Sequence, residues 1–380
     1  MANVSSSNGL EKYPKLRFKG FSEPYRIVPL GDVACEVSRT DPNSKAPVMM
    51  LSAGNGFIMQ SEKYSRDNAG QSLKKYTLLK KGELAYNHGA SKAKQFGCCY
   101  QLEVDEALVP FVYHCFSVNK EYAPYVSTVL NISTTERQLK KLVSSSVRMD
   151  GLLNISYDDY MTVELALPSM DEQQKVSCFL SLLEEKIKKQ QQLVEHLKKY
   201  KRGASDRIFF EADGWDHVAF LDVFSTIPDK PYQVTTSEYY DSGIYEVVDQ
   251  GKNDIVGYNN DESKVFNAIP IIVYGDHTTI IKYRNTPFIV GGDGVKLLTT
   301  KTNNNLQYLY YALCQYNIQP EGYKRHFSIV KHLDIPIPSL EKQQVIAKTL
   351  ATLDMKIQKE SCLLENLLMQ KKAIIKNLFI

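Results

Sequence analysis

The chain has 380 residues, of which 43% are hydrophobic and 23% are charged, and its formal net charge at pH 7 is +3. These values are typical of an ordinary globular protein with two to three folding units, and the small net charge neither favours nor excludes nucleic acid. Seven cysteines without a C-x-x-C spacing argue against a disulfide framework or a zinc site and favour a reducing cytoplasm.

Residues 1–20 are expected to form an N-terminal tail. The opening MANVSSSNGLEKYPK has no apolar segment of the kind that a secretory signal needs. No apolar run in the chain approaches the ~20 residues of a membrane-spanning helix. The sequence therefore predicts a cytoplasmic protein without a membrane span.

The first globular half, predicted over residues 21–166, opens with YRIVPLGDV (Tyr25–Val33). GELAYNHG (Gly82–Gly89) is typical of a short buried strand that ends in a polar turn, and the lysine-bearing SKAKQF follows it. The strand-like runs CCYQLEV and PFVYHCFSV come next, and a helix is expected around Pro124–Val143. This half is therefore predicted as a mixed α/β (α+β) domain with a twisted, mainly antiparallel sheet.

A long helix is predicted over residues 167–210. Pro168 keeps the preceding residue extended, Ser169 suits an N-cap, and Glu172 three residues later completes a capping box. Apolar residues then recur in alternating steps of four and three, which is the seam of a coiled coil. The seam includes Leu180, Leu183, Ile187, Val194 and Leu197, with the polar residues Gln190 and Lys201 in the same row.

The second globular half, predicted over residues 211–336, repeats the order of the first. WDHVAFLDV (Trp215–Val223) has the same aromatic, apolar and Asp-Val spacing as YRIVPLGDV. PIIVYGDH (Pro270–His277) again indicates a buried strand that ends in a polar turn, and TTIIKYR follows it. A helix is expected around Leu306–Tyr316, so a second mixed α/β domain is predicted.

A second long helix is predicted over residues 337–380. Val163–Phe209 and Leu333–Phe379 align without a gap at an offset of 170, with fourteen identities in 47 pairs. Its seam includes Leu350, Leu353, Ile357, Leu364 and Leu367, with the polar residues Glu360 and Lys371. We expect the two helices, each ~60 Å long, to pack antiparallel and to separate the domains in a pseudo-two-fold internal repeat. This arrangement predicts Glu360 beside Lys201 and Gln190 beside Lys371.

No catalytic motif occurs in the sequence. It has no G-x-x-x-x-G-K-[ST] nucleotide loop, no H-E-x-x-H or paired metal-ligand set, and no N/D-P-P-Y/F motif of a DNA amino-methyltransferase. We therefore expect a non-catalytic protein that needs neither a metal nor another cofactor.

The ordered motifs of the chain resemble those of the specificity subunits of type I restriction–modification systems. The resemblance lies in the domain–helix–domain–helix order, the doubled P-S-x-x-x-Q-Q helix starts, RFKGF (Arg17–Phe21), VVDQG (Val247–Gly251), YGDHTT (Tyr274–Thr279) and GGDGVKLL (Gly291–Leu298). It implies two target-recognition domains, each of which reads one half of a bipartite, asymmetric sequence in double-stranded DNA. It also implies helices that set the unread gap and dock two methyltransferase subunits, which translocase–nuclease subunits join. The specificity subunit itself would perform no chemistry.

Candidate base-reading residues follow a strand end at matching places in the two halves. Reading bases in the major groove needs polar side chains at positioned turns. The candidates are Asn87, His88, Ser91, Lys92 and Lys94 in the first domain, and Asp276, His277, Thr278, Thr279 and Lys282 in the second. The alternative is that these residues form turns on solvated loops.

Basic residues near these clusters suit phosphate contacts, which position a protein on DNA without specifying a sequence. The candidates are Lys74, Lys75, Lys80, Lys81, Lys252, Arg284, Lys296, Lys324 and Arg325. The alternative is that they are ordinary surface side chains. Glu211–His332 has ten Lys and Arg against fifteen Asp and Glu, so the bases must gather on one face or partner subunits must supply affinity. A coiled-coil protein–protein scaffold with two ligand-binding heads and no role on DNA is the alternative function.

Overall fold

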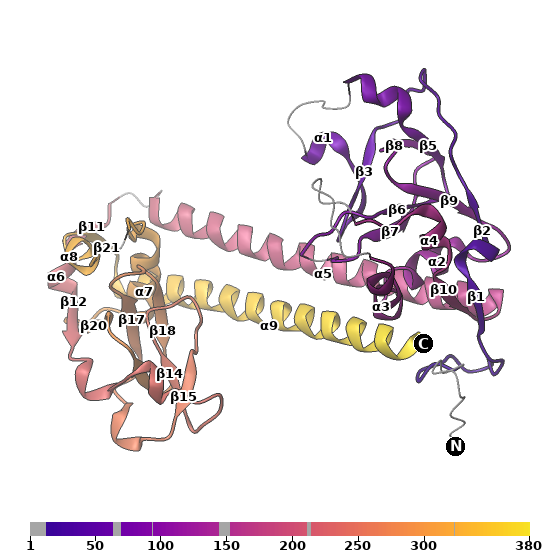
Figure 1. Ribbon diagram of the computed structural model, residues 1–380. Coiled ribbons are helices and arrows are strands. Elements are labelled where there is room, and N and C mark those ends of the chain that lie inside the picture. Colours follow the sequence, from indigo (N-terminus) through magenta and orange to yellow (C-terminus); the bar gives the residue numbers. More distant parts are fainter. Residues whose placement is uncertain (1–12, 64–69, 93, 144–152, 211–213, 323) are drawn as a thin grey trace. The chain divides into compact units, whose positions relative to one another are not determined.

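The computed structural model describes all of the chain except residues 1–12, 64–69, 93, 144–152, 211–213 and 323. The chain divides into two compact units, unit 1 (Met1–Lys189 with Leu364–Ile380) and unit 2 (Gln190–Leu363). Two long helices, α5 (Met170–Phe210) and α9 (Leu340–Leu378), each contribute to both units (Figure 1). In the described residues, no helix combines the length and hydropathy that a membrane span requires.

The largest sheet of unit 1 has four antiparallel strands in the order β2–β9–β6–β7. Their bounds are Ala34–Glu36 for β2, His114–Val118 for β9, Leu84–Asn87 for β6 and Cys98–Gln101 for β7. Three antiparallel pairs accompany it: β1 (Arg26–Pro29) with β10 (Glu164–Leu167), β3 (Met49–Ser52) with β4 (Gly56–Met59), and β5 (Thr77–Lys80) with β8 (Glu106–Val109). The short helices are α1 (Gln60–Lys63), α2 (Ala123–Val129), α3 (Ser133–Leu142) and α4 (Tyr157–Met161).

The helix predicted around Pro124–Val143 is in fact two helices, α2 and α3. Asn131 lies between them, and its side-chain nitrogen donates to Ser127 O at 2.8 Å and to Cys99 O of strand β7. Its side-chain oxygen accepts from the Cys99 N–H at 3.3 Å. These bonds tie the chain to the sheet at this point, and Ile132 is extended, so a new helix starts at Ser133.

Unit 2 contains two larger sheets, of four and five strands. The first is antiparallel, in the order β12 (Phe224–Ile227), β20 (Val295–Thr300), β17 (Ile271–Gly275) and β18 (Ile281–Arg284). The second contains β13 (Gln233–Val234), β19 (Phe288–Gly291), β14 (Tyr245–Val248), β15 (Gly257–Asn259) and β16 (Val265–Phe266), with β13 and β14 parallel to β19. A separate antiparallel pair joins β11 (Asp216–Ala219) to β21 (Asp334–Ile337). The short helices are α6 (Phe220–Val223), α7 (Leu306–Tyr316) and α8 (Phe327–Val330).

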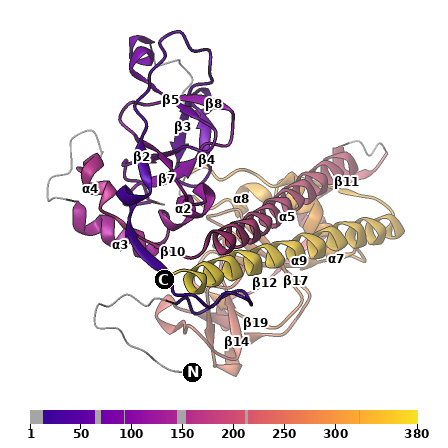
Figure 2. The same cartoon turned by 90° about the vertical axis from the view of Figure 1, so that its right-hand side faces the viewer.

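Helices α5 and α9 pack together along the predicted seams (Figures 1 and 2). In unit 1, Val176 and Leu180 share a core with Leu378, and in unit 2, Phe209 shares a core with Ile346 and Leu350. Within each unit, residues with higher numbers in α5 contact residues with lower numbers in α9. The pairing of the two helices is therefore antiparallel. The predicted seam residues are all buried or half-buried.

The predicted register of the two helices is wrong. Lys201 binds Asp354, six residues before the expected Glu360, and Lys371 binds Glu184 at 2.7 Å. Gln190 donates to the carboxylate of Glu360 at 2.7 Å. The observed register gives each seam lysine a carboxylate partner, whereas the expected one would have left Lys371 with an uncharged glutamine.

Candidate nucleic-acid interface

Each sheet domain is attached to the start of a long helix by the first glutamine of the repeated Q-Q pair. Gln173 accepts from the Tyr122 N–H at 2.9 Å and donates to Pro168 O at 3.0 Å. In unit 2, Gln343 accepts from the Asn305 N–H at 2.9 Å and donates to Pro338 O at 2.9 Å. Both glutamines are buried. The repeated P-S-x-x-x-Q-Q motif therefore encodes a joint between a long helix and the first turn of α2 or α7.

Matching tyrosines extend this repeat into the domains. Tyr125 of α2 donates its hydroxyl to Ala166 O at 3.3 Å, and Tyr308 of α7 donates to Pro336 O at 2.5 Å. The segments YRIVPLGDV and WDHVAFLDV also make equivalent bonds. The Leu30 N–H donates to Val163 O, and the Phe220 N–H donates to Leu333 O. We call these shared joints, together with α5 and α9, the frame.

Glu172 has a different place from the one that the capping-box pattern predicts. Its two oxygens accept from Arg17 at 2.9 and 2.7 Å, and one of them also accepts from the Tyr25 hydroxyl at 3.3 Å. The bond to Glu172 raises the pKa of Arg17. The RFKGF segment is thereby attached to α5, and the Leu16 N–H donates to Asn377 O of α9.

Three loops of unit 2 meet at Gln250, which lies in VVDQG but is not among the predicted site residues. Its side-chain oxygen accepts from the His277 N–H at 3.0 Å, and its nitrogen donates to Asp293 O at 2.8 Å. Its main-chain oxygen accepts from the Thr278 hydroxyl. Gln250 thus joins the loops after β14, β17 and β19. The signal for it was the turn-forming D-Q-G, in which the Gly251 N–H donates to the Asp249 carboxylate.

Four of the candidates near these loops are buried. Lys282 donates its ammonium hydrogens to Asp249 O at 2.8 Å and Asn253 O at 2.5 Å, and burial lowers the pKa of Lys282. Arg284 forms ion pairs with Glu246 and Asp254. The Asp276 carboxylate accepts from the Phe327 N–H at 2.9 Å, and Thr279 has a positive φ of 58°. These side chains hold the loops of unit 2 in place.

The remaining candidates of unit 2 lie nearer the surface. His277 and Thr278 are half-buried, and the His277 Nδ1 lies 3.3 Å from Lys324 O. Lys252, Lys324 and Arg325 are exposed, and Lys296 is half-buried. Lys324 pairs with the exposed Glu321. The loop cluster around Gln250 therefore presents one imidazole, one hydroxyl and several cations near its surface.

The base-reading candidates of unit 1 lie at the end of β6 and in the segment that follows it. Asn87 accepts from the Gly89 N–H at 2.9 Å, and the buried His88 places its Nδ1 2.9 Å from Leu153 O. Lys94 donates to Asn131 O at 2.7 Å and to Glu136 at 2.8 Å. Ser91 and Lys92 are exposed, as are all the phosphate candidates of this unit, Lys74, Lys75, Lys80 and Lys81. Ser91, Lys92 and these lysines are thus the candidates of unit 1 that lie at the surface.

Within the described part of the chain, no cluster of three or more His, Cys, Asp or Glu side chains could hold a metal ion.

Comparisons with known proteins give the following matches. Residues 212–368 match the family model of the type I restriction modification DNA specificity domain. A stretch of 86 residues is 31% identical to the type I restriction enzyme EcoR124I/EcoR124II specificity subunit of Escherichia coli. That alignment covers 22% of this chain and 21% of the Escherichia coli protein, so the chain matches about a fifth of that relative's length.

Two solved structures share the fold. The type I restriction–modification system S subunit from M. genitalium superposes with a TM-score of 0.67 at 14% identity, over 97% of this chain and 99% of that one. A structure that describes complex assembly and conformational transition of the type I R-M system has a TM-score of 0.51 at 15% identity, over 93% and 97% of the two chains. At these identities, the likeness concerns the fold.

Proposed function

We propose that this chain is a specificity subunit of a type I restriction–modification system, which reads a two-part DNA sequence and catalyses no reaction itself. The match of residues 212–368 to the DNA specificity domain of that family, the similar stretch in the Escherichia coli subunit and the shared fold support this proposal. Each sheet domain reads one half of an asymmetric site in double-stranded DNA. Methyltransferase subunits bound to the same chain supply the chemistry, and translocase–nuclease subunits join that complex.

The observation that carries this proposal is a repeated frame with unlike loops. Gln173 and Gln343 make the same pair of bonds, and Tyr125 and Tyr308 bind equivalent carbonyls. The loops that follow the strands differ in length, sequence and bonding. Two different readers on one repeated frame are what a bipartite but non-palindromic target requires.

In the second domain, we assign base reading to His277 and Thr278 on the loop cluster around Gln250. An imidazole and a hydroxyl can both bond to base edges in the major groove. Lys252, Lys324 and Arg325 are assigned to phosphates, because exposed cations near reading loops position a protein on the duplex. The buried candidates Asp276, Thr279, Lys282 and Arg284 keep the reading loops in one conformation.

In the first domain, Asn87, Ser91 and Lys92 are the corresponding base-reading residues. His88 and Lys94 support them from behind, since their side chains already bind Leu153 O, Asn131 O and Glu136. The lysine pairs Lys74–Lys75 and Lys80–Lys81 are assigned to phosphates. This assignment separates Asn87, Ser91 and Lys92, which are half-buried or exposed, from His88 and Lys94, whose side chains fix the loop.

Helices α5 and α9 are proposed to set the distance between the two half-sites. A paired helix is stiff, so binding of one domain makes the binding of the second effectively intramolecular and fixes the spacing. The exposed apolar side chains of the helices suit a partner protein, among them Leu182, Tyr200, Met355 and Met369. We assign these outer faces to methyltransferase subunits.

The proposal is tested by sequencing methylated bases in cells with and without this chain, with its methyltransferase subunit present in both. The expected result is methylation at one two-part sequence that disappears without the chain. Purified chain should also bind duplex DNA with an affinity that falls as salt rises. Identical methylomes and no binding to duplex DNA would instead favour a protein–protein scaffold.

A second test addresses the spacer role. Insertion of seven residues into both α5 and α9 adds two helical turns while it keeps the seam in phase. The expected result is methylation at the same two half-sites with a longer gap between them. An unchanged gap would contradict the spacer role while leaving DNA reading intact.

A further inference from the structure

Helix α2 of unit 1 and helix α7 of unit 2 hold the same position in the frame but carry different side chains. Tyr125 and Tyr308 are equivalent because they bind equivalent carbonyls, Ala166 O and Pro336 O. Counting from these tyrosines pairs Ser127 with Tyr310 and Thr128 with Tyr311. Two large aromatic side chains of α7 therefore correspond to two small polar ones of α2.

In unit 2, Tyr311 fills the space between α7 and the long helices. Its hydroxyl donates to the Asp354 carboxylate at 2.8 Å, and the Lys201 ammonium lies 5.3 Å from the centre of its ring. The ring of Tyr310 packs at 4.9 Å from that of Tyr311. The phenol is thus held by a carboxylate acceptor, a cation beside the ring and a second aromatic ring.

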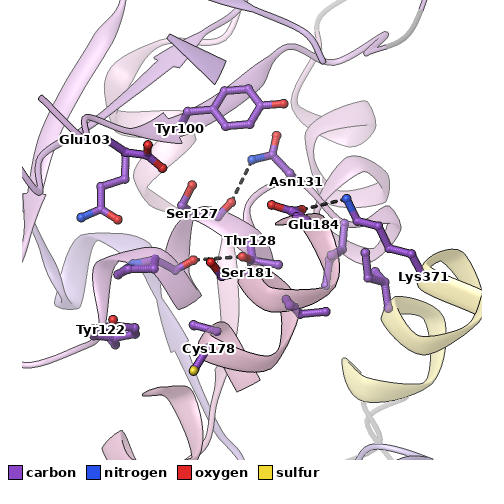
Figure 3. A pocket seen from close by; sticks show the side chains of 16 residues that line it. Tyr100, Glu103, Tyr122, Ser127, Thr128, Asn131, Cys178, Ser181, Glu184 and Lys371 are labelled. Carbon is purple, nitrogen blue, oxygen red and sulfur yellow. Dashed lines mark hydrogen bonds and ion pairs between the residues drawn. The ribbon is translucent and has the colours of Figure 1, made fainter. Parts of the chain in front are cut away.

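Unit 1 has the same ion pair without this phenol. Glu184 and Lys371 stand at the positions equivalent to Asp354 and Lys201, at the offset of 170, and their side chains lie 2.7 Å apart. A pocket of about 640 Å³ occurs at this place (Figure 3). Its lining includes Ser127, Thr128, Ser181, Glu184, Lys371 and Ile375.

The walls of this pocket are suited to an aromatic ring. Tyr100 and Tyr122 line it, together with the apolar Leu180 and Ile375. Exposed residues of α5, Cys178 and Ser181, also line it, so a group from outside can reach it. Side chains of Glu184 and Lys371 are 61% and 30% exposed, against 40% and 26% for Asp354 and Lys201, which agrees with a missing ring.

We propose that this pocket of unit 1 binds the phenol side chain of a tyrosine from a partner protein, with its hydroxyl donating to Glu184 and its ring beside Lys371. The inference rests on the proposed function, in which the partner is a methyltransferase subunit. Two carboxylates in the lining, Glu103 and Glu184, disfavour a phosphate backbone. Phe179 and Leu182, exposed on α5 next to Cys178 and Ser181, extend the contact with apolar surface.

The proposed site makes the two units unequal toward a partner. Unit 2 fills the equivalent place with its own Tyr311, whereas unit 1 leaves it for a side chain from outside. A methyltransferase subunit bound to unit 1 would therefore be anchored by an aromatic residue, and such residues often dominate the binding energy of an interface.

The pocket is tested first with p-cresol, the side-chain analogue of tyrosine, on the full chain with labelled threonine and isoleucine methyl groups. The signals of Thr128 and Ile375 should shift on titration, and toluene should bind about three- to tenfold more weakly because it cannot donate a hydrogen bond. Glu184→Ala should remove this preference. Since Glu184 is mostly exposed, that variant keeps the fold.

Two reciprocal substitutions then test the comparison between the units. Thr128→Tyr should fill the pocket, abolish the p-cresol shifts and weaken binding of the methyltransferase subunit about tenfold or more. Tyr311→Thr should create a p-cresol site in unit 2. Thr226→Tyr, on the exposed side of strand β12, is the matched control and should leave both measurements unchanged.

Each outcome decides one claim. Unshifted Thr128 and Ile375 signals would overturn the phenol pocket. If p-cresol binds but Thr128→Tyr leaves methyltransferase affinity unchanged, the pocket does not serve docking and the proposal fails. A chain that binds neither methyltransferase nor DNA would refute the proposed function, and with it the identity of the partner, even where p-cresol binds.

Discussion

Unit 1 and unit 2 attach a sheet domain to a long helix by the same bonds, but they differ at the start of that helix. Unit 1 has the buried Glu172 bound to Arg17, whereas unit 2 has the exposed Lys342 at the equivalent position. Most of the shared bonds join a repeated glutamine or tyrosine side chain to a main-chain group of the domain. The frame is therefore repeated through the same glutamine and tyrosine side chains in both units, while unit 1 has an additional buried ion pair of its own.

The largest effect is expected when the reinforcement of unit 1 is removed. Glu172→Ala leaves the Arg17 guanidinium without its carboxylate at a site where the Glu172 side chain is 1% exposed. We expect a loss of about 3–5 kcal/mol in the stability of unit 1. Lys342→Ala is the matched control and should change stability by less than about 0.5 kcal/mol.

Hydrogen exchange localises this loss to a unit. Faster exchange of β1 and β10 in Glu172→Ala, with unchanged fluorescence unfolding of Trp215 in unit 2, is the expected pattern. Equal losses in the two alanine variants would contradict the difference between the units.

A smaller but symmetric effect is expected at the shared joints. Gln173→Ala and Gln343→Ala each leave one buried carbonyl without its partner, at about 1–3 kcal/mol. The N–H that each variant also leaves without its partner is only half-buried and should add less. The neighbouring exposed glutamines supply controls, Gln174→Ala and Gln344→Ala. Urea unfolding followed by circular dichroism should give similar losses for the two buried sites. A loss at only one of them would mean that the joint is not repeated energetically.

A substitution in the proposed reading loops of one domain should change one half-site and leave the other half-site unchanged. His277→Ala removes one of the side chains that we propose to read bases in unit 2, and we expect relaxed discrimination at one base pair, by about 1–3 kcal/mol. Methylome sequencing should show the change in one half-site only. Asn87→Ala in unit 1 is the counterpart and should alter the other half-site. Loss of both half-sites in either variant would indicate misfolding rather than altered reading.

The smallest effect is expected at the paired lysines of the seam. Lys201→Ala and Lys371→Ala each remove a partly exposed ion pair, which contributes about 0.2–1 kcal/mol. Lys201 should cost more than Lys371, because Lys201 also lies beside the ring of Tyr311. Thermal unfolding at low and high salt measures both. A larger cost at Lys371 would contradict the difference between the filled and the open pocket.

Much of the frame could be predicted from the sequence, because a constant offset of 170 preserves the phase of the two seams. The offset between equivalent residues rises to 183 at Tyr125 and Tyr308 and to 190 at Tyr25 and Trp215. Loops of unequal length cause these changes. The sequence therefore predicts a helix at the end of each half, but only the folded chain matches α2 to α7 residue by residue.

The candidate site was harder to predict for a physical reason. Lys282 and Arg284 are charged, which predicts exposure, but their strand alternates buried and half-buried residues and places both inward. Gln250 holds three loops that are far apart in sequence, so only the folded chain brings its partners together. The predicted helix register was wrong because the seam lysines bind carboxylates that lie beside the seam, Glu184 and Asp354.

The two lysine–carboxylate pairs along α5 and α9 also bear on how the chain reaches its fold. Because the helices carry the same pattern, a parallel alignment would bring equivalent residues face to face, with Lys201 against Lys371. Like charges in one row repel, whereas the antiparallel alignment gives each ammonium a carboxylate. The charged residues of the repeat therefore disfavour a parallel pairing of the two helices while the chain folds. A seam of leucines alone would not distinguish the two alignments in this way.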